Sequence, residues 1–147
     1  MKKIYSKRGF TLAELLVVVA IIAVLVAVSI PIFTGKLEKA REATDIGNMR
    51  AAKAAAVTIY LTNDKTDDTV NWNANDDGFY AYYNAATGKL QKSTTGITTY
   101  GKGTAIDGGC EDYMDYKKDT VASEKMIRIT VSNEGTVSEN WYKNSNP

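Results

Sequence analysis

The sequence predicts an α+β protein in which one long N-terminal helix, apolar enough in its first half to span a membrane, packs on a small antiparallel β-sheet head. Three observations predict this. An uncharged run covers residues 15–35, an amphipathic stretch continues it, and residues 63–147 are rich in Asn, Asp, Thr, Gly and Tyr. The length of 147 residues leaves room for one modest domain beside the apolar run.

The apolar run is long enough to cross a lipid bilayer. At the standard helical rise it extends roughly 30 Å, which is about the thickness of the hydrocarbon core. It is longer than the apolar region of an ordinary secretory signal, so we expect it to stay with the protein. Four basic residues precede it: Lys2, Lys3, Lys7 and Arg8. The positive-inside rule then predicts a cytoplasmic N-terminus and a head outside the cell.

Four residues make this segment distinctive. Gly9 separates the basic tip from the apolar run, and Phe10 opens the run. Glu14 places a carboxylate one turn into the apolar helix, where an unpaired charge costs a few kcal/mol or more. Pro31 lies near the far end of the run, where it removes a helical hydrogen bond.

The string KRGFTLAELL, residues 7–16, resembles the processing site of type IV prepilins and of the pseudopilins of secretion and competence systems. The resemblance covers residues 1–60. It implies a cut between Gly9 and Phe10 by a dedicated peptidase on the cytoplasmic side, followed by N-methylation of Phe10. It also implies the type IV pilin fold and assembly into a filament by pilus machinery. One departure is Ala23, where many members of the family carry Gly.

The physical chemistry of the new N-terminus agrees with that resemblance. After cleavage Phe10 carries an ammonium group, and Glu14 lies in the first turn, where the helix dipole favours an anion. In a filament Glu14 would pair with the Phe10 ammonium of a neighbouring subunit and set the register between subunits. Alternatively, Glu14 reaches the lipid headgroups. Pro31 either ends the membrane span or forms a kink or melted turn that lets helices pack.

The second half of the helix is amphipathic. We expect one nearly continuous helix from about Phe10 to about Leu61, ended by the polar residues that follow. Its apolar face carries Ile46, Met49, Ala52, Ala56 and Ile59. Charged residues are expected on its other faces: Glu38, Arg41, Glu42, Asp45, Arg50 and Lys53. The predicted divisions are a cleaved leader (1–9), a membrane and filament-core half (10–35), an amphipathic half (36–62) and an extracellular head (63–147).

The head has few aliphatic residues before Met126, so it needs the helix face to complete its core. Alternation of apolar and polar residues over Met126–Tyr142, with a turn at 133–135, predicts a β-hairpin. The stretch 78–90 is compatible with a short helix or a strand. Residues 94–100 are a plausible strand, and residues 102–119 are expected to form a loop.

Composition argues against several classes of function. Without histidine the chain lacks the commonest general base and metal ligand, and it shows no nucleophile elbow or phosphate loop, so no enzymatic role and no cofactor are predicted. Beyond residue 9 there are 14 basic and 17 acidic residues, which argues against nucleic-acid binding. The lone Cys110 excludes an internal disulfide and is either a small buried apolar residue or a free thiol.

Three features of the head are candidate sites. Asn73, Asn75 and Asp77, followed by Gly78, resemble the start of a calcium loop, although Asn84 occupies the place of the bidentate Glu and a polar turn is the alternative. An acidic loop surrounds Cys110 and is expected to be solvated: Asp107, Glu111, Asp112 and Asp115. Four aromatic residues would form either part of the core or a sugar-stacking patch: Trp72, Tyr80, Tyr82 and Tyr83.

These observations predict a structural subunit of a type IV pilus that is anchored first in the cytoplasmic membrane and later in a homo-oligomeric surface filament. The alternatives are a pseudopilin of a type II secretion or DNA-uptake system and a minor pilin adhesin. Because one cysteine cannot form the disulfide that closes the head in many Gram-negative pilins, the sequence favours a Gram-positive source.

Overall fold

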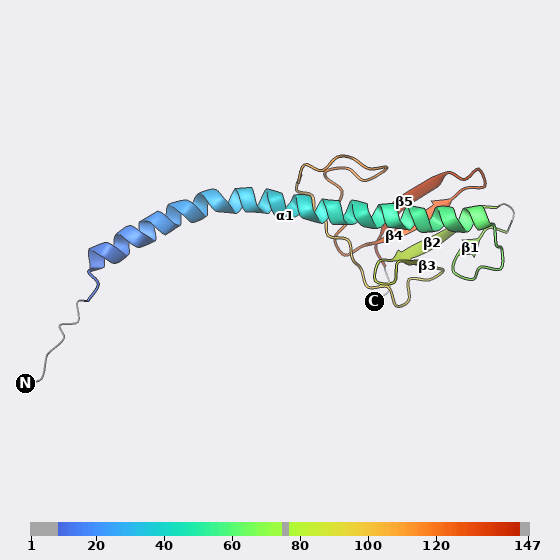
Figure 1. The fold of residues 1–147 in the computed structure, drawn as a ribbon, viewed down its shortest axis with the longest axis horizontal. Coiled ribbons are helices and arrows are strands. Elements are labelled where there is room, and N and C mark those ends of the chain that lie inside the picture. The colour runs from blue at the N-terminus through green and yellow to red at the C-terminus, as the bar shows by residue number, and fades with distance from the viewer. Residues whose placement is uncertain (1–8, 75–76, 145–147) are drawn as a thin grey trace, which may run out of the picture. The chain divides into compact units, whose positions relative to one another are not determined.

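The computed structural model describes residues 9–74 and 77–144. It contains one helix, α1 (Leu12–Thr62), and five strands: β1 (Asn71–Trp72), β2 (Phe79–Asn84), β3 (Lys89–Gln91), β4 (Met126–Val131) and β5 (Val137–Tyr142) (Figure 1). The predicted α+β architecture, a long N-terminal helix with a small antiparallel sheet, is confirmed. The chain divides into two compact units between Thr34 and Gly35, and each is described by itself.

The first unit is the apolar part of α1. Its large apolar side chains are exposed on every side of the helix, as expected for a segment that is apolar all round. The helix continues through Pro31, so this proline does not end it. Two hydroxyl groups near Pro31 bond to helix carbonyl oxygens: Ser29 Oγ donates to Leu25 O at 2.7 Å, and Thr34 Oγ1 donates to Ile30 O at 3.0 Å.

The second unit contains the rest of α1 and the antiparallel sheet. β2 lies between β4 on one edge and both β1 and β3 on the other, and β5 pairs with β4. The predicted hairpin is therefore present as β4 and β5, with Val131 opposite Val137 beside the turn. The ambiguous stretch 78–90 contains β2 and the start of β3, and these two strands form a second hairpin.

The core lies between α1 and one face of the sheet. On the helix, Met49, Ala52 and Ala56 are fully buried. On the sheet, Phe79 of β2 and Ile129 of β4 are fully buried in the same core. Small residues on the helix let its backbone approach the sheet closely, while the bulk comes from the strands. The predicted apolar face is confirmed, with Ile46 also buried and Ile59 partly buried.

Two expectations were wrong. Residues 94–100 form no strand, because Gly96 adopts a positive φ of 77° in a turn closed by Ile97 N donating to Thr94 O at 3.1 Å. Glu38, Glu42 and Asp45 were expected on faces of the helix other than the buried apolar face, yet each is at most 1% exposed. They are buried because a loop from the head covers them and donates hydrogen bonds to their carboxylates.

Candidate functional site

The start of α1 is built by Thr11 and Glu14. The Thr11 backbone N–H and its Oγ1 donate to Glu14 Oε2 at 2.8 and 2.7 Å, and Glu14 N donates to Thr11 Oγ1 at 3.2 Å. This is a capping box, in which a Thr and a Glu three residues apart satisfy each other's orphan N–H groups. The Thr-x-x-Glu spacing was visible in the sequence, but the apolar surroundings drew attention to the charge of Glu14 instead.

The predicted cleavage point lies immediately before this cap. Gly9, Phe10 and Thr11 are exposed and lie outside the helix, and Phe10 is 83% exposed. A methyl group placed on Gly9 would contact nothing within 4 Å. The peptide between Gly9 and Phe10 is thus in open, non-helical chain. The leader residues before Gly9, including Lys7 and Arg8, lie outside the described residues.

The apolar half of α1 forms an extended surface. Among the described residues, α1 is the one helix long and apolar enough to cross a membrane, and none of its most apolar stretch is buried. Its exposed side chains are almost entirely Leu, Val, Ile and Ala, with Phe33 at the far end. An isolated chain in water would lose free energy by exposing this surface, so it needs lipid or other protein around it.

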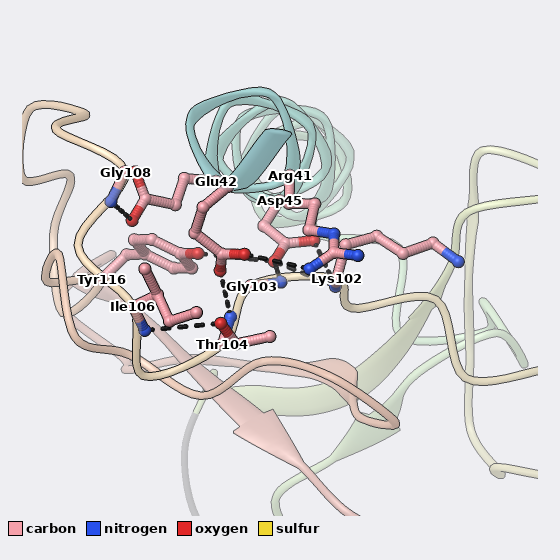
Figure 2. A network of polar contacts seen from close by, with 10 residues as sticks. Arg41, Glu42, Asp45, Lys102, Gly103, Thr104, Ile106, Gly108 and Tyr116 are labelled. Atoms are coloured by element: carbon pink, nitrogen blue, oxygen red, sulfur yellow. Dashed lines mark hydrogen bonds and ion pairs between the residues drawn. The ribbon is translucent and has the colours of Figure 1, made fainter. Parts of the chain in front are cut away.

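In the second unit, three buried carboxylates on α1 hold a loop of the head. We call Glu38, Glu42 and Asp45 the carboxylate ladder and residues 101–110 the clamp loop. The spacing of four and three residues places the ladder on one side of the helix. Figure 2 shows the side chains of Glu42 and Asp45 pointing from the helix toward the loop, where each meets a backbone N–H group.

All three carboxylates accept backbone hydrogen bonds. Asp45 accepts from Gly103 N at 2.6 Å and from Lys102 N at 3.0 and 3.1 Å. Glu42 accepts from Gly108 N at 2.8 Å and from Cys110 N at 3.1 Å, one bond to each carboxylate oxygen. Glu38 accepts from Thr104 N. These are charge-assisted bonds, which are roughly twice as strong as bonds between neutral groups.

Neighbouring side chains complete the electrostatics of the ladder. Burial alone would raise the pKa of Glu38, but the bonds from Thr104 and from Arg41, whose Nη1 lies 3.1 Å from Oε2, hold that pKa below its usual value. At Asp45 burial outweighs the bonds from Gly103, Lys102 and Tyr116, so its pKa is raised. The Tyr116 hydroxyl donates to Asp45 Oδ2 at 3.4 Å.

Two glycines let the clamp loop approach the helix. A Cβ on Gly108 would lie 2.4 Å from the backbone nitrogen of Lys39, and one on Gly103 would lie 2.2 Å from the Tyr116 hydroxyl. Real Cβ atoms do not come this close to other heavy atoms. Because the ladder binds the backbone of the loop, any larger residue at these positions would push the N–H groups away from their acceptors.

A fourth buried acid, Glu139 on β5, has no such partners. Its side chain is 1% exposed and lies on the core face opposite Ile129. Both carboxylate oxygens are buried without a hydrogen-bond partner among the described residues. Burial raises the pKa of Glu139 to about 7, with Lys53 lowering it and Asp115 raising it. The sequence did not single out Glu139, because the strand around it shows a regular alternation of apolar and polar residues.

The loop around Cys110 is solvated, as predicted. Asp107 and Asp112 are exposed and pair with Lys118 at 3.2 Å and Lys117 at 3.3 Å. Cys110 is a free, half-buried thiol that donates to Lys39 O at 3.4 Å. Burial first, and then the Glu42 carboxylate, raise the pKa of this thiol. A raised pKa lowers the thiolate fraction, which fits an unreactive cysteine.

The remaining predicted sites have different outcomes. For the calcium hypothesis, Asp77 pairs with Lys65 at 2.6 Å, and Asn75 lies outside the described residues, so calcium binding stays a prediction. Among the described residues there is no group of three acidic or cysteine side chains arranged to hold a metal ion. The four aromatic residues are divided: Tyr83 is in the core and Trp72 packs against it, whereas Tyr80 and Tyr82 are partly exposed.

Comparison with known proteins bears on the N-terminal segment. Residues 4–30 match the prokaryotic N-terminal methylation motif. The type IV major pilin protein PilA of Myxococcus xanthus is 36% identical over 64 residues, which cover 44% of this chain and 29% of that protein. The chain is therefore similar to a type IV pilin over less than half of its length, and residues 4–30 carry the methylation motif.

A second relative is a fimbrial protein. Fimbrial protein Q of Moraxella bovis is 36% identical over 50 residues, covering 34% of this chain and 32% of that protein. The matched segment is thus about a third of the length of these relatives, and no solved structure matches the chain. One name describes a pilin and the other a fimbrial protein. The predicted Gram-positive source gains no support from these relatives.

Proposed function

We propose that this protein is a type IV pilin, a structural subunit of a pilus that is cut between Gly9 and Phe10 and assembled through the apolar half of α1. The observation that carries the proposal is the combination of an open cleavage point, a capping box and a long helix exposed on all sides. A filament of packed helices would bury this surface, as a bilayer would before assembly.

In this proposal the N-terminus starts in the cytoplasm, where a prepilin peptidase removes residues 1–9 and Phe10 is methylated. Residues 10–35 anchor the chain in the membrane and then form the filament core. Residues 36–62 carry the head, residues 63–147, on the outside. The basic leader supports this orientation through the positive-inside rule. The pilus assembly machinery would move the subunit from the membrane into the filament.

The capping box supports a specific role for Glu14. Both hydrogen bonds from Thr11 go to Oε2, so Oε1 is the atom that would meet the Phe10 ammonium of a neighbouring subunit. Thr11 holds the carboxylate at the helix start, where the exposed Phe10 also lies. A pre-positioned carboxylate loses less conformational entropy on pairing, which favours one register between neighbouring subunits.

Pro31 would act within the same helix. It has no N–H, so the carbonyl of Ala27 lacks its usual helical donor. The hydroxyl bonds of Ser29 and Thr34 occupy other carbonyls around it. We infer that this is the place where α1 opens or bends during packing in the filament.

The test is intact-mass and N-terminal analysis of protein sheared from producing cells. The proposal expects fibres whose chain begins at Phe10 and is heavier by one methyl group. Glu14→Ala should be inserted and cleaved but should assemble poorly as the sole subunit, whereas Gly9→Leu should keep its leader. Abundant fibres of uncut chain would overturn the processing step, and a normal fibre yield from Glu14→Ala would overturn the pairing.

A further inference from the structure

The sheet has a second face that points away from α1. Strand residues alternate between faces, and Phe79, Ala81, Ile127 and Ile129 belong to the core that contains the helix residues. The residues between them therefore lie on the opposite side. We call this side the open face. In β2, β4 and β5 it carries Tyr80, Tyr82, Asn84, Met126, Arg128, Thr130, Ser138, Asn140 and Tyr142, and from β3 it carries Lys89 and Gln91.

Three tyrosine rings form a row on the open face. The ring centroids of Tyr80 and Tyr82 are 6.4 Å apart at 88°, and those of Tyr82 and Tyr142 are 5.3 Å apart at 55°. Tyr142 comes from β5 and the other two from β2, so β4 lies between the strands that supply the row. All three are partly exposed. The sheet thus fixes three aromatic rings in one continuous surface.

Arg128 lies within this row. Its guanidinium carbon is 4.6 Å from the centroid of Tyr80, and in register Arg128 is opposite Tyr82 and Asn140. Its Nε is buried without a hydrogen-bond partner among the described residues, so stacking on the tyrosine holds the group. Thr130 and Ser138 pair in the next register position. A cation, hydroxyl groups and an amide therefore border the rings.

The charge of the open face differs from that of the rest of the chain. Among the described strands its charged residues are Arg128 and Lys89, which are both basic, while the sequence beyond residue 9 has more acidic than basic residues. The acid of β5, Glu139, lies on the core side. An anionic ligand would meet no opposing carboxylate among the described strand residues of this face.

We propose that the open face binds an acidic polysaccharide. The C–H faces of sugar rings pack on tyrosine rings, while sugar hydroxyls bond to neutral polar groups such as Asn140 and Thr130. A carboxylate on the sugar pairs with Arg128, which is already oriented by stacking on Tyr80. This binding is a property of the head and does not depend on the assembly proposed above.

The experiment is isothermal titration of the full chain in detergent micelles with polygalacturonate, with neutral dextran of the same size as comparison. We expect Tyr82→Thr and Arg128→Gln each to weaken polygalacturonate binding at least tenfold, and added salt to weaken it further. The matched control is Arg50→Gln, because Arg50 stacks on Tyr113 at 5.1 Å away from this face. That variant should bind like the wild type.

Several results would overturn the proposal: no polygalacturonate heat with the wild type, equal binding of dextran, or an equal loss in Arg50→Gln. A second measurement uses the wild-type protein alone, so it does not depend on whether a variant folds. Tyrosine nitration of the wild type, mapped by mass spectrometry, should show Tyr82 and Tyr142 protected by saturating polygalacturonate and Tyr113 unprotected. Unchanged nitration of Tyr82 would also refute binding at the open face.

Discussion

Glu139 should make the head less stable as the pH rises through neutrality. The pKa of this carboxyl is raised from its ordinary value of 4.5 to about 7 by burial. Below pH 4.5 the group is protonated in both the folded and the unfolded chain. Between pH 4.5 and about 7 only the unfolded chain releases the proton, so the free energy of unfolding falls, and above this range the loss is complete.

The size of the effect follows from the same two values. Each pKa unit corresponds to about 1.4 kcal/mol, so the raised pKa of Glu139 removes about 3 kcal/mol of stability between pH 4 and pH 8. Two charged groups act on the Glu139 carboxyl: Lys53 on α1 favours its ionisation, and Asp115 opposes it. The hydroxyl groups of Tyr100 and Tyr113 also interact electrostatically with Glu139.

The variant Glu139→Gln isolates this titration, because an amide has nearly the same shape and does not ionise. Urea unfolding of the full chain in micelles, followed by tryptophan fluorescence, gives the free energy of unfolding at each pH. The difference between wild type and variant should change by about 3 kcal/mol between pH 4 and pH 8. A constant difference, or the same change in the control Glu134→Gln in the exposed hairpin turn, would refute the reasoning.

Three further predictions concern the ladder, the clamp loop and the helix start; thermal or urea unfolding measures the first two, and hydrogen exchange measures the third. Glu42→Ala should cost about 2–5 kcal/mol, since it leaves the N–H groups of Gly108 and Cys110 unpaired; a cost as small as that of the exposed Glu111→Ala would contradict this. Gly108→Ala should destabilise the head, whereas Gly47→Ala, where a methyl group meets nothing within 4 Å, should stabilise it by about 0.5–1 kcal/mol; equal effects would show that the clamp loop moves freely. Thr11→Ala should lower helicity at the start of α1, seen as faster hydrogen exchange at residues 12–15, by removing a cap that contributes about 1 kcal/mol; unchanged exchange would refute the capping box.

The elements in which apolar residues recur at regular spacing were predictable from the sequence. The helix follows from an apolar run joined to a 3-4 stripe, and the β4–β5 hairpin follows from alternation around a turn that contains Gly135. The loops were less predictable, because their course depends on distant partners. The strand expected at 94–100 is absent because Gly96 has a positive φ. A glycine allows this conformation but does not force it, so the sequence alone does not predict the turn.

The carboxylate ladder was missed for a related reason. Charged side chains on a helix are usually solvated, and the partners of Glu38, Glu42 and Asp45 are backbone N–H groups about 60 residues away, which have no side-chain pattern. One indication was present. Positions 38, 42, 45, 49, 52 and 56 continue the buried stripe with alternating steps of four and three, so the ladder lies on the line of Met49 and Ala52.

The way the clamp loop is held leaves its side chains free to diversify. The ladder contacts the backbone N–H groups of Lys102, Thr104 and Cys110, so exchanging these side chains removes none of those donors. The constraint falls instead on the glycines at 103 and 108 and on the three acids of the helix. A head built in this way can present new surface chemistry over many generations while the framework beneath keeps its shape.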